Sequence, residues 1–405
     1  MSRLDELLQQ YCPNGVEYKP LKSVSIMQRG TSITKAQARD GIYPVISGGR
    51  EPAFYCDTYN RDGETVTVAG SGAGAGYVQY FNEPLFANDC FTIKGLAGIS
   101  TKYLYYCMSW MQERISGTKK GGGVPHVHIS NIDRFEIPVP PLPVQQEIVR
   151  ILDKFTELEA ELEAELERRK AQYEWYRDQL LTFRRDGGPD VPLLPWLQKL
   201  LDRYVPNGVE WKAIDDVFDI RNGYTPSKNV AEYWTDGVIP WYRMEDIRQN
   251  GRILSDSIQH ISESAIKNGK LFKSNSIILA TTATIGEHAM LIADSLANQQ
   301  FTNFAICELL SDKLLSKYVF YYFFKIDEWC KNNVKVGNFA AVDVDKLKKQ
   351  LFPIPPLEVQ EVIVSVLDNF STLVTDISSG LPAEIAARHK QYEYYRGKLL
   401  AFERA

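Results

Sequence analysis

The chain has 405 residues, 44% hydrophobic and 24% charged, with a formal net charge of −5. This length allows two or three domains with ample cores, and no apolar run reaches the roughly 18 residues of a membrane-spanning helix. The acidic first residues argue against a signal peptide, and the six scattered cysteines form no CxxC pair. We therefore expect a cytoplasmic protein with reduced thiols, no structural zinc and no membrane contact. The acidic balance does not by itself indicate nucleic-acid binding.

The first part of the chain predicts short strands separated by glycine- and proline-containing turns. The run Thr65–Ala69 (TVTVA) has the composition of a strand. It leads into the loop Gly70–Gly76, which is similar to a dinucleotide- or AdoMet-binding loop. Such loops need a helix next, whose N-terminus meets the phosphates, whereas Tyr77–Phe81 is strand-like. We interpret the loop as a hairpin tip where backbone can approach a ligand closely, with a cofactor loop as the alternative.

A long helix follows in the middle of the chain. Apolar residues recur three and four positions apart along it, at Ile148, Ile151, Phe155, Leu158, Leu162 and Leu166. This narrow stripe is typical of a helix that packs against another helix. About 38 residues of α-helix within Val144–Phe183 would run roughly 57 Å at 1.5 Å per residue. That length suits a spacer or a dimerisation arm.

The same helix carries an acidic run with a repeated Glu-Leu-Glu-Ala unit. Its members are Glu157, Glu159, Glu161, Glu163, Glu165 and Glu167. We interpret the run as the solvated face of the helix. Each added unit would lengthen the helix by about 6 Å.

Beyond this helix the chain repeats itself. Four pairs of segments match: Tyr11–Lys19 with Tyr204–Lys212, Ile137–Leu142 with Phe352–Leu357, Val144–Leu158 with Val359–Leu373, and Lys170–Phe183 with His389–Phe402. The strand-like run Ser276–Ala280 corresponds to Thr65–Ala69, whereas the loops that follow these two runs differ completely. The chain is therefore predicted to consist of two homologous halves, each a globular region followed by a long helix.

Proline and glycine mark the boundaries of these parts. Proline runs precede both long helices, and Asp186–Pro195 is the predicted linker between the halves. Gly380 and Pro382 interrupt the second long helix. Two helical pieces, Leu357–Ile377 and Pro382–Phe402, are therefore expected.

The predicted fold class is α+β, with two homologous globular domains of mixed β-sheet and helices. The two long helices separate these domains and pack as an antiparallel coiled coil, which gives an internal pseudo-two-fold repeat. The predicted boundaries are residues 1–143 for the first domain, 144–185 for the central helix, 186–203 for the linker and start of the second half, 204–356 for the second domain and 357–405 for the C-terminal helix, broken near 378–382.

No motif indicates catalysis, so no catalytic or metal-binding residue is predicted. Val139–Leu142 superficially resembles the Asn-Pro-Pro-aromatic motif of amino-methyltransferases but lacks both the asparagine and the aromatic residue. His126 and His128 could share one face of a strand, but no third metal ligand is near in sequence. Loop or DNA-facing histidines are the preferred interpretation, with metal binding as the alternative.

Aromatic residues near the ends of the long helices exceed what one helix seam needs. They are Tyr173, Trp175, Tyr176, Tyr392, Tyr394 and Tyr395. A thick intramolecular core is one interpretation. A docking surface for another protein is the other, because aromatic anchors dominate interfaces.

Taken over its whole length, the chain resembles the specificity subunit of type I restriction–modification systems. The resemblance rests on the boundary sequences IPVPPLPVQQEIVRILDKF and FPIPPLEVQEVIVSVLDNF, the helix ends QYEWYRDQLL and QYEYYRGKLL, the ELEAELEAELE run and PNGVEWK. The duplication makes the match specific.

The resemblance implies that each globular half is a target recognition domain for one half of a bipartite DNA site. The paired helices would act as a ruler that sets the number of unread base pairs. Double-stranded DNA, two copies of an AdoMet-dependent methyltransferase subunit and an ATP-dependent restriction subunit would be the partners. AdoMet, ATP and Mg²⁺ would belong to those partner subunits, and this chain would hold no cofactor.

Residues that could read DNA are basic or polar residues on loops, since such groups contact phosphates and base edges. In the first domain we select Arg29, Thr31, Ser32, Lys35, Ser47, Arg50, Ser71, Tyr77, Lys119, Lys120 and His126. In the second domain we select Arg221, Thr225, Ser227, Lys228, Trp241, Arg243, Thr281, Thr282, Thr284 and Lys335. For any one of them, an ordinary solvated side chain is the alternative. Because the loops diverge between halves, the two half-sites should differ in sequence.

Two other classes of protein compete with this interpretation. A duplicated coiled-coil scaffold that binds only proteins would show no salt-dependent affinity for DNA. A stand-alone nuclease or methyltransferase would bind AdoMet or carry a catalytic cluster, and the sequence offers neither motif.

Overall fold

The computed structural model describes residues 2–121, 123–183, 194–335, 340–375 and 380–405. The chain divides into two compact units. Unit 1 comprises Met1–Glu165 and Ala383–Ala405, and unit 2 comprises Leu166–Pro382. Each unit therefore contains one globular region and parts of two long helices.

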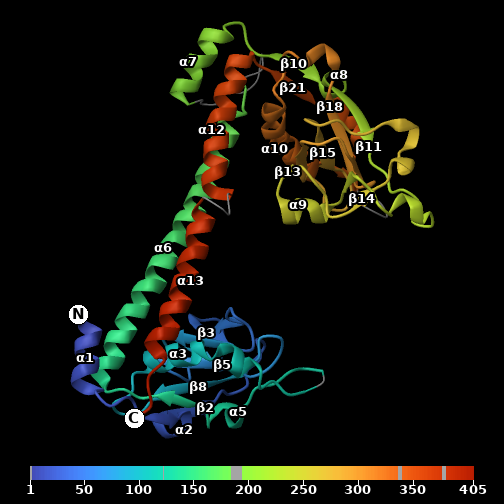
Figure 1. The fold of residues 1–405 in the computed structure, drawn as a ribbon. Coiled ribbons are helices and arrows are strands. Elements are labelled where there is room, and N and C mark those ends of the chain that lie inside the picture. The colour runs from blue at the N-terminus through green and yellow to red at the C-terminus, as the bar shows by residue number, and fades with distance from the viewer. Residues whose placement is uncertain (1, 122, 184–193, 336–339, 376–379) are drawn as a thin grey trace. The chain divides into compact units, whose positions relative to one another are not determined.

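Unit 1 contains nine short strands and several helices (Figure 1). The strands are β1 (Tyr18–Pro20), β2 (Ser25–Arg29), β3 (Tyr43–Ile46), β4 (Phe54–Cys56), β5 (Thr65–Ala69), β6 (Val78–Phe81), β7 (Phe86–Ala87), β8 (Cys90–Gly95) and β9 (Glu136–Pro138). The helices are α1 (Arg3–Tyr11), α2 (Leu21–Val24), α3 (Thr101–Trp110), α4 (Gln112–Ser116), α5 (Ile129–Ile132), the first part of α6 (Leu142–Leu180) and most of α13 (Leu381–Leu400). The strand predicted at Thr65–Ala69 is confirmed as β5, and the strand-like segment after the glycine loop is β6.

The sheets of unit 1 have the orders β2-β8-β5-β6, β4-β3-β7 and β1-β9. All their pairs are antiparallel except β3 with β7. Helix α3 packs on the four-stranded sheet, and Tyr103 and Leu104 are buried between them. Strand β5 does not alternate between buried and exposed residues. Both of its faces are covered, so all five of its residues are buried.

Unit 2 repeats this plan with extra elements. Its strands are β10 (Glu210–Ala213), β11 (Phe218–Asn222), β12 (Ile239–Tyr242), β13 (Ile253–Leu254), β14 (His260–Ile261), β15 (Ile277–Ala280), β16 (His288–Leu291), β17 (Leu296–Ala297), β18 (Phe301–Ile306), β19 (Val334–Lys335), β20 (Ala341–Val342) and β21 (Leu351–Ile354). Its helices are α7 (Pro195–Tyr204), α8 (Ile214–Val217), α9 (Met244–Asn250), α10 (Ser316–Asn332), α11 (Val344–Lys348) and α12 (Leu357–Thr375), with short 3-10 turns at Ala231–Tyr233, Glu263–Ala265, Lys267–Gly269 and Glu308–Leu310.

The corresponding sheets of unit 2 have the orders β11-β18-β15-β16-β13, β14-β12-β17 and β10-β21, with β19-β20 as a separate ribbon. The parallel pair β12–β17 matches β3–β7. Helix α10 covers the large sheet, as α3 does in unit 1. The described fold is therefore α+β and contains the predicted internal repeat.

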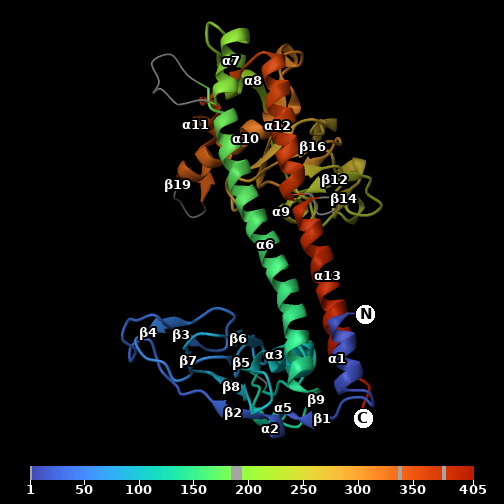
Figure 2. The same cartoon turned by 90° about the vertical axis from the view of Figure 1, so that its left-hand side faces the viewer.

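Helix α6 begins two residues before the predicted start and ends at Leu180. In unit 1 it lies beside α13 in both views (Figures 1 and 2), and the ring of Phe155 lies 5.5 Å from that of Tyr395. His389 Nδ1 is 2.7 Å from Glu159 Oε1, so the two helices run antiparallel. In unit 2 the later part of α6 meets α12, where the rings of Tyr176 and Phe370 are 5.1 Å apart.

The predicted apolar stripe was partly wrong. Leu158 is 41% exposed, whereas Leu152, which the stripe omitted, is fully buried. Val144, Ile148 and Leu152 lie four residues apart and face the core of unit 1, because α6 must cover the globular region as well as a second helix.

The second long helix is described as two pieces, α12 and α13, close to the two pieces predicted. The predicted break at 378–382 and the predicted linker at 186–195 include residues outside the described part of the chain. All six cysteines are free thiols. Among the described helices, none is both long and apolar enough to cross a membrane.

Candidate DNA interface

In unit 1 the loop after β5 is the centre of a cluster of polar loops. Ser71 pairs with His126 in an isolated bridge, and Lys120 pairs with His126 from the other side. The Gly72 N–H donates to the Pro125 carbonyl at 3.0 Å. The segment that carries Lys119 and Lys120 is therefore held against the glycine loop, although about 50 residues separate them in the sequence.

Two histidines and an arginine extend this cluster. The rings of His126 and His128 stack 6.0 Å apart at an interplanar angle of 4°. Arg29, at the end of β2, places Nη2 3.1 Å from His128 Nδ1. All three side chains are exposed. Within the described ranges, no group of three or more His, Cys, Asp or Glu could hold a metal ion.

Asn88 joins two further loops to the same surface. Its Nδ2 donates to Ser47 Oγ at 2.9 Å, and its Oδ1 accepts the Ile33 N–H at 3.0 Å. The guanidinium of Arg50 lies 4.9 Å from the ring of Tyr77. Of the remaining predicted residues, Thr31 and Ser32 are exposed, and Lys35 lines a separate cavity of about 280 Å³ beside β4.

Unit 2 builds the same arrangement from different side chains. Thr282 pairs with Ala341 as Ser71 pairs with His126, and Lys335 pairs with Ala341 as Lys120 does with His126. The Val342 N–H donates to the Thr281 carbonyl at 2.8 Å. Lys335 therefore occupies the position of Lys120.

The loop tips also correspond in their backbone conformation. Ala283 has φ +61° where Gly72 has φ +81°. For alanine, this left-handed conformation costs about 1–2 kcal/mol, and Thr284 follows directly and is half-buried. A strained residue held at a loop tip is typical of sites where the loop conformation matters for binding.

A second correspondence places Arg243 at the position of Ser47. The Asn298 N–H donates to the Tyr242 carbonyl at 3.0 Å, as the Asn88 N–H donates to the Ile46 carbonyl at 2.9 Å. Each of these strands is followed by the corresponding predicted residue. Ser47 and Arg243 thus lie on equivalent loops.

Other predicted residues of unit 2 are engaged within the domain. Arg221 donates from Nη2 to the Leu271 carbonyl at 2.6 Å, and the Thr225 hydroxyl pairs with Gln299. Trp241 and Thr281 are only 4% and 5% exposed, so their side chains lie in the interior. Ser227 and Lys228 are exposed, and Lys335 Nζ forms an ion pair of 2.8 Å with Asp343.

This ion pair affects the titration of Asp343. The hydrogen bond from Lys335, followed by the Lys346 N–H, lowers the pKa of the Asp343 carboxyl below its ordinary value despite partial desolvation. The β19–β20 ribbon therefore carries a charged pair at neutral pH.

Sequence reasoning missed the residues that attach each long helix to its domain. Gln145, which is 1% exposed, donates from Nε2 to the carbonyls of Pro140 and Gly98 at 2.8 and 3.2 Å and accepts the Ser100 N–H at 2.9 Å. Gln360 makes the same three bonds in unit 2, to Pro355, Lys313 and Leu315. Both glutamines occupy matching positions in the repeat, which was the available signal.

A second attachment is also duplicated. Asp153 of α6 accepts from Lys102 Nζ at 2.8 Å and from the Tyr106 hydroxyl at 2.6 Å. In unit 2, Asp368 accepts from Lys317 and Tyr321 at the same two distances. Burial, then the hydrogen bond to the carboxylate, raises the pKa of both tyrosines, so their hydroxyls stay protonated donors.

The predicted docking tyrosines divide into two groups. Tyr173 and Tyr392 are 8% and 7% exposed and belong to the cores of units 2 and 1, which corresponds to the intramolecular alternative. Tyr176 is half-buried against Phe370. The exposed aromatic side chains are Trp175, Tyr394 and Tyr395, at 51%, 57% and 40%.

Comparison with known proteins identifies the family. The model of the type I restriction modification DNA specificity domain matches residues 13–168 and 206–387. The two matches together cover more than half of the chain. The chain therefore belongs to this family of DNA specificity subunits, which are non-catalytic, and the resemblance stated from the sequence is confirmed.

Individual relatives agree with this assignment. The EcoprrI specificity subunit of Escherichia coli is 48% identical over 217 residues, which are 52% of this chain and 53% of that protein. The EcoR124I/EcoR124II specificity subunit of E. coli is 35% identical over 317 residues, 74% of this chain and 70% of that protein. The match thus spans about half the length of the first relative and more of the second.

Solved structures share the fold. A chain from a type I restriction–modification structure concerned with complex assembly and conformational transition has a TM-score of 0.61 at 16% identity, covering 96% of this chain and 98% of its own. The S subunit from M. genitalium has a TM-score of 0.55 at 15% identity, covering 96% and 97%. These identities support the fold alone.

Proposed function

We propose that the loop clusters of the two units each read one half of a bipartite, asymmetric DNA site. The observation that carries this proposal is their equivalence: Ser71 with His126 in unit 1, and Thr282 with Ala341 in unit 2, form the same pairing beside a lysine. In this proposal, residues 1–143 and 204–356 are the target recognition domains. Their different loop side chains select different half-sites.

Within each cluster the side chains divide by chemistry. Lys119, Lys120 and Lys335 suit phosphate contacts, which position a protein on DNA without reading its sequence. Arg29 and Arg243 carry guanidinium groups that can pair with guanine in the major groove. The serines, threonines and histidine of the clusters supply shorter-range contacts.

The long helices set the spacing in this proposal. Gln145 and Asp153 fix α6 to unit 1, and Gln360 and Asp368 fix α12 to unit 2. A change in helix length is then transmitted to the reading surface. One Glu-Leu-Glu-Ala unit of about 6 Å corresponds to one or two base pairs at roughly 3.4 Å each.

The proposed partners complete the assembly. Two copies of an AdoMet-dependent methyltransferase subunit would dock on the helices, with exposed Trp175, Tyr394 and Tyr395 as aromatic anchors. An ATP- and Mg²⁺-dependent restriction subunit would join them. In this proposal the chain holds no cofactor of its own, and it works in the cytoplasm, where the DNA is.

Methylome sequencing of cells that carry this chain with its methyltransferase tests the proposal. It should reveal one bipartite motif, and exchanging the loops within residues 221–335 should alter only one half of that motif. A change in both halves would refute independent reading. Purified complex without salt-dependent DNA affinity would instead favour a protein-binding scaffold, for which the comparisons give no support.

A further inference from the structure

Unit 2 contains a cavity of about 440 Å³ beside its candidate DNA-reading loops. Its walls include Lys228, Trp234, Trp241, Arg243 and Gln259. Arg243 lies on the loop that corresponds to Ser47 in unit 1, and Lys228 follows Thr225 in the loop after β11. The cavity therefore opens on the surface proposed to face DNA.

Two tryptophans form its aromatic wall. Their ring centroids are 5.0 Å apart and the rings are nearly perpendicular, at 83°. The indole N–H of Trp234 donates to the Ser227 carbonyl at 3.1 Å, and that of Trp241 donates to the Tyr224 carbonyl at 3.0 Å. Because both N–H groups are satisfied by backbone, the rings are fixed in orientation, and the surface they offer a ligand is π surface.

The polar wall lacks partners. The Nε of Arg243 is buried and has no hydrogen-bond acceptor within the described chain, while its Nη2 lies 3.2 Å from Glu245. The side-chain amide of Gln259 makes no hydrogen bond to any described residue, although its backbone carbonyl accepts from Ser257 Oγ at 2.6 Å. Because the Nε atom has almost no accessible surface, a ligand in the cavity would meet the exposed third of the Arg243 side chain and the Gln259 amide.

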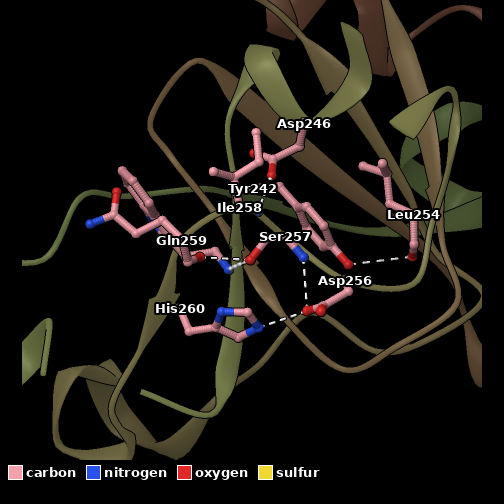
Figure 3. A network of polar contacts seen from close by, with 9 residues as sticks. Tyr242, Asp246, Leu254, Asp256, Ser257, Ile258, Gln259 and His260 are labelled. Carbon is pink, nitrogen blue, oxygen red and sulfur yellow. Dashed lines mark hydrogen bonds and ion pairs between the residues drawn. The ribbon is translucent and has the colours of Figure 1, made fainter. Parts of the chain in front are cut away.

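A buried network fixes the backbone at these two polar residues, and Figure 3 shows its members Asp246, Ser257, Ile258 and Gln259. The carboxylate of Asp246, which is fully buried, accepts the backbone N–H of Arg243 at 2.7 Å and the backbone N–H of Ile258 at 2.6 Å. The hydroxyl of Ser257 accepts the backbone N–H of Trp241 at 3.0 Å and donates to the backbone carbonyl of Gln259. The two sides of the cavity are therefore joined through bonds that fix the backbone from which the side chains of Arg243 and Gln259 extend.

We propose that this cavity accepts one nucleobase that leaves the base stack of the DNA bound by unit 2. The inference rests on the function proposed above. The tryptophans offer stacking surface, Gln259 offers an amide donor and acceptor for a base edge, and the exposed part of the Arg243 guanidinium can donate to a base oxygen or nitrogen. Exposed Lys228 at the rim suits the attached phosphate.

An aromatic side chain of a partner protein fits this cavity less well. A phenyl ring would leave the Gln259 amide unpaired, whereas a base edge presents donors and acceptors together. The position of Trp241 is Val45 in unit 1, since Trp241 pairs with Leu296 where Val45 pairs with Phe86. Unit 1 therefore lacks an aromatic residue at this position, so only unit 2 should hold such a base, apart from the bases that the methyltransferase subunits extrude for modification.

The test measures the affinity of the complex with its methyltransferase for duplexes that carry the motif from methylome sequencing. Each duplex contains one mismatched base pair. At one position in the half-site of unit 2, other than the base that the methyltransferase modifies, a mismatch should raise affinity several-fold, because the cost of unpairing the base is already met. An abasic residue at that position should lower affinity.

Trp234→Ala should weaken binding of the matched duplex by about 5- to 150-fold, the range for losing one stacking aromatic side chain. Trp234→Ala should also abolish the gain from the mismatch. If Trp234→Ala destabilises the fold, Arg243→Gln replaces it as the test and should reduce that gain. Trp196→Ala is the matched control, since Trp196 lies on α7 and is 40% exposed. It should leave both affinities unchanged.

Three results would overturn the inference. Normal DNA binding without any position at which a mismatch raises affinity would overturn this inference but not the proposed function. The same holds for a Trp234→Ala variant that no longer binds the methyltransferase subunit but still binds DNA. Unmodified complex that shows no salt-dependent affinity for the motif would overturn both this inference and the function proposed above.

Discussion

Removing the side-chain amide of Gln145 should destabilise unit 1 selectively. The variant Gln145→Ala would leave three backbone groups without their present partner: the buried carbonyl of Pro140, the partly buried N–H of Ser100 and the carbonyl of Gly98, a residue that is itself exposed. An unsatisfied buried group costs about 1–3 kcal/mol, and entry of water offsets part of this. The expected loss of unfolding free energy is therefore about 3 kcal/mol.

For a unit of this size, about 3 kcal/mol lowers the melting temperature by roughly 6–12 °C. Differential scanning calorimetry of the full chain, with hydrogen exchange on peptides around Ser100 and Pro140 to assign the transition, measures this shift. Gln146→Ala is the matched control, because Gln146 is the next residue on α6 and is exposed. Equal melting temperatures for the two variants would show that the bonds of Gln145 do not hold the helix to its domain.

Three further outcomes are expected. Burial lowers the pKa of His288, which contacts Asp327, below 6.5. The unfolded chain therefore binds more protons, so the stability of unit 2 should fall as pH drops below about 6.5. His288→Gln should make the melting temperature of unit 2 less dependent on pH between roughly pH 7.5 and 5.5; parallel curves of melting temperature against pH for the variant and the unmodified chain would contradict this. Deleting residues 161–164 should change the spacer length in the methylome and leave both half-sites intact, and altered half-sites would count against the ruler. Lys120→Ala should reduce the salt slope of DNA binding by about one. Lys22→Ala should not, because Lys22 lies on α2, just before β2, whereas Arg29 of the loop cluster ends that strand; equal slopes for the two variants would exclude a phosphate contact of Lys120.

The framework of the fold could be predicted because it depends on local patterns that occur twice. The strand at Thr65–Ala69 and the helices that follow the proline runs each have a periodicity readable in a short window. Leu152 was missed because the helix stripe was fitted to one partner. In the structure α6 packs on two surfaces, so its buried residues follow two overlapping periods.

The candidate interface could be predicted only as a set of loops. The pairing of His126 with Ser71 and Lys120 joins segments that have no common pattern, and it depends on sheet register that the sequence does not encode locally. Trp241 was selected as a residue that could read DNA, but its side chain lies inside, where it forms the wall of a cavity. That cavity depends on Gln259, which is 18 residues further along the chain and which no motif indicated.

The duplicated attachments explain how the reading loops can diverge without altering the helices. Gln145 and Gln360 bind backbone carbonyls and N–H groups, so their bonds do not depend on which side chains the domain carries. The contacts of Asp153 and Asp368 are made to α3 and α10, the helices that cover the large sheets, and not to the loops proposed to read DNA. If the proposed function holds, substitutions at Ser71 or Thr282 would change base contacts while the helix remains fixed to its domain. The proposal thus assigns reading and spacing to separate sets of residues, so that one can vary without the other.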